Sequence, residues 1–151
     1  MIFDVKCPIP GFEKTTKMRF EKTDKDEFFA RLHSEDGDPF SFTLINPYAL
    51  IKDYAFELPN HYRALLEVTE KSNIKVYNIL ILKENVESSY INLLSPILLN
   101  FDNFTMTQVV LDPALYPFYP QAEPLRTYLN SLHKEQSGEN NESCENDEAS
   151  K

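Results

Sequence analysis

Residues 74–82 read Ile-Lys-Val-Tyr-Asn-Ile-Leu-Ile-Leu, which is the strongest β-strand signal in the chain. Ile74 and Val76 lie two residues apart, and four aliphatic residues follow at 79–82. Because β-branched and large apolar side chains fit a pleated, buried surface, this stretch predicts a strand. Stretches before and after it along the chain are also rich in β-forming residues.

Seven further stretches are rich in β-forming residues or alternate with a period of two. Turn signals separate several of them. Pro8-Ile9-Pro10-Gly11 combines the fixed φ of proline with a glycine, and Glu35-Asp36-Gly37-Asp38 contains the Asp-Gly pair that closes hairpins. The predicted strands are 1–7, 18–21, 28–33, 40–44, 90–94, 97–99 and 104–111.

Two segments change to the period of a helix. Between Pro59 and Val68 the larger side chains recur at i, i+3, i+4 and i+7, and Asn60 is expected to cap this helix. Pro124 is expected to open a second short helix, because proline is favoured in a first turn. One face of that helix would carry Leu125, Tyr128, Leu129 and Leu132.

Many short strands with turn signals and only two short helices predict an all-β fold, mainly antiparallel. With about eight strands, closure into a small barrel removes the exposed sheet edges that invite aggregation. The sequence therefore predicts a small β-barrel-like domain.

The composition excludes several classes of protein. The chain has 151 residues, 42% of them hydrophobic, which is enough for one domain with a real core. Its net charge of −9 opposes direct binding to nucleic acid. No apolar run approaches the roughly 20 residues of a membrane span, and the first residues lack the layout of a signal peptide. We therefore expect a cytoplasmic protein without membrane contact.

The chain divides into a body at 1–133 and a tail at 134–151. The tail holds six acidic residues, two lysines and no large apolar side chain, so its net charge is −4 and that of the body is −5. Such a segment buries too little surface to offset the loss of chain entropy on folding. We expect it to be disordered, with Cys144 exposed and without a role.

No constellation of residues makes a case for an enzyme, a metal site or a cofactor. With only Gly11 and Gly37 in the body, neither a phosphate-cradling loop nor a nucleophile elbow can be drawn. The histidines lack metal-ligand spacing, and the nearest polar neighbours of His33, Ser34 to Asp36, are expected in a hairpin turn rather than in a ligand set. Cys7 at a strand end is expected to be a small buried hydrophobe rather than a nucleophile.

Four segments of the body remain to be explained: Ile9 to Glu13, Pro47 with Asp53-Tyr54, Asn92 to Asn100, and Gln108 to Tyr116-Pro117. Together, in this order, they resemble the FliW family of flagellar assembly factors. The third, Asn-Leu-Leu-Ser-Pro-Ile-Leu-Leu-Asn, is the most specific of them, although Ser95 stands where alanine is more usual. The resemblance spans residues 2 to 130, which is nearly the whole body.

The resemblance implies a non-enzymatic partner switch without a cofactor. Such a protein holds flagellin before export and, once flagellin has left, binds the translational regulator CsrA and keeps it off flagellin messenger RNA. Binding surfaces of this kind are expected to be apolar or aromatic patches with a polar rim. The candidate contacts are Phe12, Glu13, Tyr48, Tyr54, Asn92 and Asn100.

Other interpretations of these residues stay open at this point. The motif residues could simply maintain strand ends. The many Phe and Tyr could line a pocket in a barrel that binds a small molecule. An enzyme using Cys7 or a carboxylate pair would need a cleft with converging polar groups. An RNA-binding barrel would need a basic groove, and Asp24, Asp26 and Glu27 dilute the only basic cluster.

Overall fold

The structure is a computed structural model that describes residues 1–23 and 28–129. The predicted tail and the boundary at residue 133 lie outside the described residues. The strands are β1 (Ile2–Val5), β2 (Lys17–Lys22), β3 (Phe29–Ser34), β4 (Ser41–Ile45), β5 (Ile74–Ile81), β6 (Tyr90–Ile91), β7 (Ile97–Asn100), β8 (Thr105–Gln108) and β9 (Glu123–Pro124). The helical elements are η1 (Pro47–Ala49), α1 (Asn60–Leu66), η2 (Val86–Ser88) and a turn at 126–129.

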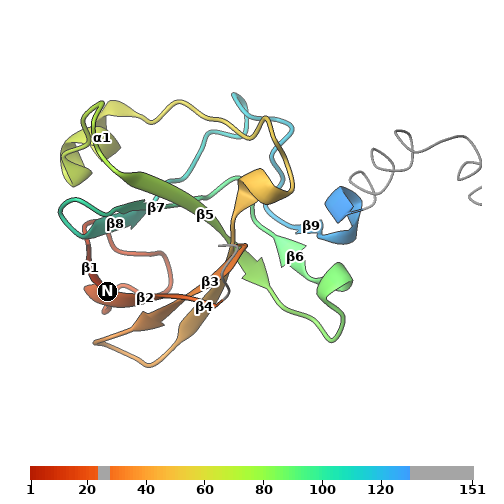
Figure 1. The fold of residues 1–151 in the computed structure, drawn as a ribbon, viewed down its shortest axis with the longest axis horizontal. Coiled ribbons are helices and arrows are strands. Elements are labelled where there is room, and N and C mark those ends of the chain that lie inside the picture. The colour runs from red at the N-terminus through yellow and green to blue at the C-terminus, as the bar shows by residue number, and fades with distance from the viewer. Residues whose placement is uncertain (24–27, 130–151) are drawn as a thin grey trace, which may run out of the picture.

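Seven of the strands close into a barrel (Figure 1). The order is β4-β3-β2-β1-β8-β7-β5, and a pairing between β4 and β5 completes the circle. All neighbours in the barrel are antiparallel except β1 and β8, which run parallel. The prediction of an all-β, mainly antiparallel barrel with short helices is thus confirmed, with one parallel pair added.

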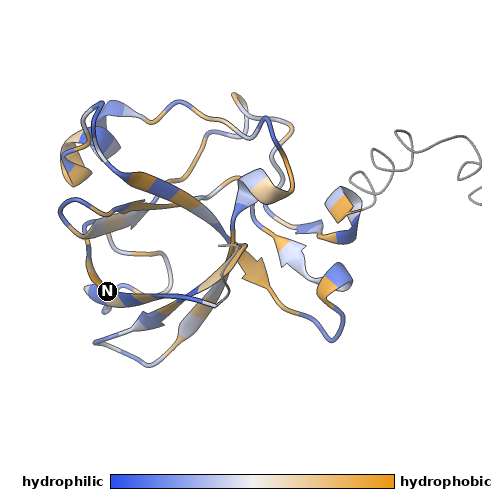
Figure 2. Cartoon of the chain, viewed as in Figure 1, coloured by the Kyte–Doolittle hydropathy of each residue, from blue (hydrophilic) through white to orange (hydrophobic). Residues whose placement is uncertain are grey.

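Strand β5 belongs to two parts of the fold. Its first half, Ile74 to Tyr77, pairs with β7 inside the barrel, whereas Leu80 and Ile81 pair with β6 on the same edge. Strand β6 in turn pairs with β9, so that these two short strands form a small lobe beside the barrel (Figure 1). Figure 2 shows a hydrophobic stretch where β5 leaves the barrel towards this lobe.

The interior of the barrel is filled with side chains from all seven of its strands. Phe20 contacts both Phe3 and Tyr77, with ring centroids 6.2 and 5.5 Å apart. Because these rings pack against one another, they form a core rather than the lining of a pocket, and this counts against the small-molecule alternative. The buried residues are Phe3, Ile9, Met18, Phe20, Ala30, Leu32, Leu44, Tyr77, Ile97, Leu99 and Met106.

The stretch predicted as a strand at 90–94 is a strand only at Tyr90 and Ile91. The side-chain Oδ1 of Asn92 accepts hydrogen bonds from the N–H groups of Leu94 and Ser95, each at 3.1 Å. An asparagine that bonds its own following backbone forms a turn, which competes with the strand ladder. The prediction was therefore wrong for 92–94.

The strand predicted at 104–111 is shorter at both ends, since β8 begins at Thr105 and ends at Gln108. Beyond it the N–H groups of Val109 and Leu111 still donate to the carbonyls of Pro96 and Leu94, at 2.8 and 3.0 Å. Pro96 has no N–H to return, so a regular ladder cannot continue. Residues 109–111 therefore lie outside any strand, although two of their N–H groups still bond to segment 94–96.

Both predicted helices exist with different starts. Asn60 is the first residue of α1 rather than its cap; Pro59 occupies the cap position and makes no side-chain hydrogen bond there. The second helical turn covers 126–129, because Glu123 and Pro124 are taken by the pairing with β6. Leu132, predicted on its apolar face, lies outside the described residues.

Two glycines in left-handed conformations shape the turns at one end of the barrel. Gly11 has φ +88° and Gly37 has φ +72°. A Cβ on Gly11 would meet nothing within 4 Å, whereas one on Gly37 would lie 3.0 Å from the backbone of Lys14. Beside Gly37, the carboxylate of Asp36 accepts the N–H groups of Thr16 and Lys17, at 2.8 and 3.1 Å. The predicted turn therefore also anchors the start of β2.

We expect Gly37→Ala to destabilise the protein more than Gly11→Ala. Both alanines take on a left-handed backbone, which costs about 1–2 kcal/mol. Only Gly37→Ala adds a clash with the Lys14 backbone, worth about 1–3 kcal/mol more. Urea denaturation of the two variants measures the difference, and equal losses would contradict a close approach at Gly37.

Candidate protein-binding site

Tyr54 and Asn78 form a buried polar network where β5 changes partner. The Tyr54 hydroxyl donates to the Leu93 carbonyl at 2.7 Å and accepts from Nδ2 of Asn78 at 3.2 Å. The same Nδ2 donates to the Asn92 carbonyl at 2.7 Å. Tyr54 is 2% exposed and Asn78 is fully buried. The network therefore ties the segment after η1 and the segment after β6 to the barrel.

Burial sets the acid–base behaviour of the tyrosines near this network. It raises the pKa of the Tyr54 hydroxyl well above its ordinary value, although the hydrogen bond from Asn78 acts in the opposite direction. Burial, assisted by the charge of Glu123, raises the pKa of Tyr128 to about 12. Both hydroxyl groups therefore stay protonated throughout the physiological range.

A row of aromatic rings runs outward from Tyr54. Tyr48 meets it edge-on with the ring centroids 6.0 Å apart. On its other side lies Tyr119, at 4.8 Å, and Tyr116 stacks on Tyr119 at 5.6 Å with an interplanar angle of 8°. The row connects the buried network to a loop at the surface, residues 112–120.

Hydroxyl groups of this row hold the loop against the extended segment 54–58. The Tyr119 hydroxyl donates to the Ala55 carbonyl at 2.8 Å and accepts from the Ala55 N–H at 3.0 Å. The Tyr116 hydroxyl accepts from the Glu57 N–H at 2.8 Å. Two tyrosines thus supply the hydrogen bonds that a neighbouring strand would otherwise make.

The loop itself presents large apolar side chains to solvent. The Asp112 carbonyl accepts from the N–H groups of Leu115 and Tyr116, each at 3.0 Å, and makes a tight turn. Leu115 is 72% exposed, Phe118 is 88% exposed and Val110 is 54% exposed. Several large apolar side chains exposed along one short segment are typical of an interaction site. We therefore take this loop and its surroundings as the candidate site.

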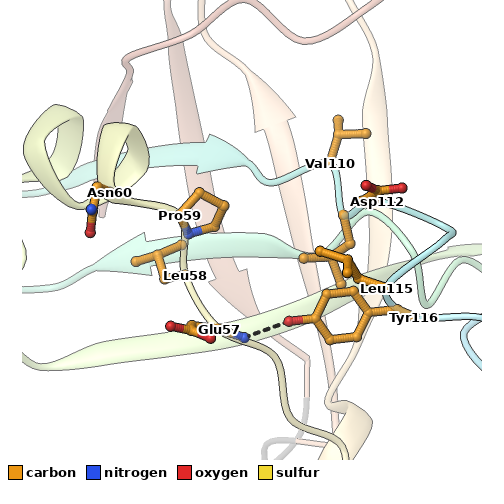
Figure 3. A pocket seen from close by; sticks show the side chains of 9 residues that line it. Glu57, Leu58, Pro59, Asn60, Val110, Asp112, Leu115 and Tyr116 are labelled. Carbon is orange, nitrogen blue, oxygen red and sulfur yellow. Dashed lines mark hydrogen bonds between the residues drawn. The ribbon is translucent and has the colours of Figure 1, made fainter.

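A groove of about 340 Å³ separates the loop from the start of α1 (Figure 3). One wall is formed by residues 57–60 and the other by residues 110–112 with 115–116, and the bond between Tyr116 and Glu57 joins the two. The Val110 N–H also donates to the Tyr62 hydroxyl of α1 at 3.2 Å. The lining consists of Glu57, Leu58, Pro59, Asn60, Val110, Leu111, Asp112, Leu115 and Tyr116.

Comparison with known protein families identifies the chain. The family model described as FliW protein matches residues 1–124, including both walls of the groove. The chain belongs to the FliW family. The resemblance drawn from the four motifs is thereby confirmed.

Named relatives and a solved structure agree with this assignment. The flagellar assembly factor FliW of Campylobacter lari is 44% identical over 129 residues, covering 85% of this chain and 97% of the relative. The flagellar assembly factor FliW 2 of Wolinella succinogenes is 44% identical over 131 residues, covering 87% and 94%. A crystal structure of the flagellar assembly factor FliW superposes with a TM-score of 0.72 at 23% identity, covering 82% and 84%, and shows the same fold.

The first FliW motif forms a turn at the edge of the barrel core. Phe12 is half-buried and stacks on Phe40 with ring centroids 4.0 Å apart. Glu13 is exposed, and its Oε2 accepts the Gly11 N–H at 2.9 Å. That hydrogen bond lowers the pKa of the Glu13 carboxyl. Contact of these two residues with a partner stays a prediction.

The two asparagines that bound the third FliW motif bond to the protein's own backbone. Asn92 makes the turn described above. Asn100 is 1% exposed; its Nδ2 donates to the Leu66 carbonyl at 2.9 Å, and its Oδ1 accepts the Asp102 N–H at 2.9 Å. In this structure Asn100 therefore joins α1 to the hairpin between β7 and β8.

Among the six candidate contacts, the Tyr48 ring meets that of Tyr54, and the Asn78 side chain bridges the Tyr54 hydroxyl to the Asn92 carbonyl. Tyr48 is 45% exposed and could meet a partner directly, whereas the buried Tyr54 could act only by supporting its neighbours. Sequence reasoning missed Val110, Leu115 and Phe118. For Leu115 and Phe118 a usable signal was present, since apolar residues between the prolines of 113–120 have no strand or helix to bury them.

The residues weighed as catalytic or metal-binding have ordinary surroundings. His33 lies in β3, within the strand predicted at 28–33, with Nδ1 2.7 Å from Ser41 Oγ and Nε2 3.1 Å from Glu21 Oε1. Cys7 is exposed and not the buried hydrophobe expected. Within residues 1–23 and 28–129 no group of His, Cys, Asp and Glu could hold a metal ion. In the same part of the chain, no helix is long and apolar enough to cross a bilayer.

We expect Tyr54→Phe to lower the free energy of unfolding by about 1–3 kcal/mol. The change leaves the buried Leu93 carbonyl without its donor and removes an acceptor from Asn78, and unpaired buried groups carry a cost of this size. Urea denaturation measures the loss. Tyr48→Phe is the matched control, because its ring is half exposed, and a similar loss in both variants would contradict a special role for the Tyr54 hydroxyl.

Alkaline pH should destabilise the protein through the same tyrosine. In the unfolded chain Tyr54 ionises near pH 10, whereas in the folded protein its raised pKa keeps it protonated. The folded state then binds more protons, so the free energy of unfolding falls as the pH rises above about 10. Urea denaturation between about pH 9 and 11 should show a shallower fall for Tyr54→Phe than for the wild type. Parallel profiles would disprove the assignment.

Proposed function

We propose that this FliW-family chain is a non-enzymatic partner switch that acts in the cytoplasm. It binds flagellin before export, as a chaperone does, and binds CsrA once flagellin has left. Bound CsrA no longer represses translation of flagellin messenger RNA. Family membership and the names of its relatives as flagellar assembly factors support the link to the flagellum.

The observation that carries the proposal is the braced, apolar loop beside the groove. Leu115 and Phe118 are exposed, while the neighbouring Tyr116 and Tyr119 hold the loop by hydrogen bonds to segment 54–58. A rigid apolar surface loses little conformational entropy when a protein docks on it. These features favour binding of a protein over a chemical reaction.

The charge of the chain supports the regulatory half of the proposal. A net charge of −9 attracts basic protein surfaces over a distance and repels the phosphates of RNA. Regulators of the CsrA type bind RNA through basic surface, so an acidic partner can act on translation without touching RNA. Two partners that share one limited protein are coupled by mass action. Free flagellin would then release CsrA.

The proposal predicts that purified chain binds purified flagellin and purified CsrA, and that flagellin reduces the amount of CsrA bound. Isothermal titration calorimetry with each partner, followed by titration of CsrA into the preformed flagellin complex, measures both effects. Leu115→Asp should weaken binding of at least one partner by about tenfold or more, since it places a charge on the apolar contact surface.

Leu82→Asp is the matched control for that experiment. Leu82 is also an exposed leucine, at 50%, but it follows β5 and does not line the groove. Unchanged binding by Leu115→Asp, or an equal loss in both variants, would remove the groove from the proposal. Absence of binding to both proteins would contradict the partner switch itself.

A further inference from the structure

The charges along the groove have one sign. Of the nine residues that line it, Glu57 and Asp112 are acidic and none is basic. Glu57 belongs to the wall formed by 57–60 and Asp112 to the opposite wall, and both are exposed (Figure 3). The apolar floor and edges come from Leu58, Pro59, Val110, Leu111 and Leu115. In Figure 3 the Glu57 side chain points away from the opposite wall, so its carboxylate lies outside the groove, where a basic side chain that flanks a bound apolar one would reach it.

The groove is formed before any partner arrives. The Tyr116 hydroxyl spans it to the Glu57 N–H at 2.8 Å, and the Tyr62 hydroxyl holds the Val110 N–H at 3.2 Å. Its volume of about 340 Å³ lies at the small end of ligand pockets, which run from about 300 to 1,000 Å³. It therefore suits a few side chains from one segment rather than a broad folded surface.

We infer that the groove takes a short segment of a partner protein in which a large apolar side chain is flanked by Lys or Arg. The apolar side chain covers Leu58, Val110 and Leu115, and the basic side chains pair with Glu57 and Asp112. Complementary charges around an apolar anchor select the partner and orient it. The inference rests on the proposed function only in taking the groove as a protein-binding site.

Peptide display on the immobilised full chain tests this inference without assuming any partner. We expect the selected peptides to carry Leu, Ile, Phe or Met with Lys or Arg within three residues. A synthetic copy of the strongest peptide, measured by fluorescence anisotropy, should bind Leu115→Asp weakly and lose affinity as salt is added. Acidic or uncharged consensus sequences, or no enrichment, would overturn the inference.

A pair of charge-matched double variants separates local from overall charge. Glu57→Gln with Asp112→Asn removes both groove carboxylates, and asparagine can still accept the Ala114 N–H that Oδ1 of Asp112 accepts at 2.9 Å. Glu70→Gln with Glu87→Gln removes two exposed carboxylates that do not line the groove. The peptide should bind the first double variant about three- to tenfold more weakly and the second as the wild type. Equal effects would overturn the inference.

The experiments distinguish failure of this inference from failure of the proposed partner switch. If flagellin and CsrA both fail to bind while an apolar and basic peptide competes at the groove, the partner switch fails and the inference stands. If both proteins bind with unchanged affinity to the variant lacking Glu57 and Asp112 carboxylates, and the selected peptides are not basic, the inference fails and the partner switch stands.

Discussion

The hydrogen bonds among Tyr54, Asn78 and the Leu93 carbonyl hold together the two parts of this fold. Strand β5 pairs with β7 over Ile74 to Tyr77 and with β6 over Leu80 and Ile81, so one edge of the strand must change neighbours at Asn78. The Asn78 side chain fills that break by donating to the Asn92 carbonyl and to Tyr54. Buried networks of this kind make a local arrangement unique because each member has few other partners.

The candidate site depends on that network through the aromatic row. Residues 113–120 contain Pro113, Pro117 and Pro120, which cannot donate hydrogen bonds, so the loop cannot pair with segment 54–58 as a strand. Instead, the hydroxyl groups of Tyr116 and Tyr119 accept hydrogen bonds from backbone N–H groups of that segment. Their inward position leaves Leu115 and Phe118 facing solvent. The same packing that anchors the loop therefore creates the exposed apolar surface and one wall of the groove.

Predictions from the sequence succeeded where local preference and tertiary packing agree. Strand β5, the hairpin at 35–38 and helix α1 have strong local signals, and the barrel satisfies all of them. The errors lie where a side chain or a proline interrupts the strand ladder. Residues 92–94 looked like a strand, but Asn92 turns the chain; residues 109–111 looked like one too, but Pro96 breaks the ladder opposite them. Neither competing contact can be recognised from the alternation of apolar residues alone.

The sequence by itself determined the all-β class, the acidic charge and, through four motifs in order, the resemblance to the FliW family. Only the tertiary structure decided which residues could meet a partner. The sequence does not distinguish Tyr54 and Asn100 from Tyr48 as candidate contacts. In the structure the first two are buried, and their side chains donate hydrogen bonds to backbone carbonyls. Leu115 and Phe118 belong to residue types that usually pack in a core, yet both are exposed. The sequence shows how apolar each side chain is. Its exposure to solvent depends on which segments of the folded chain pack beside it.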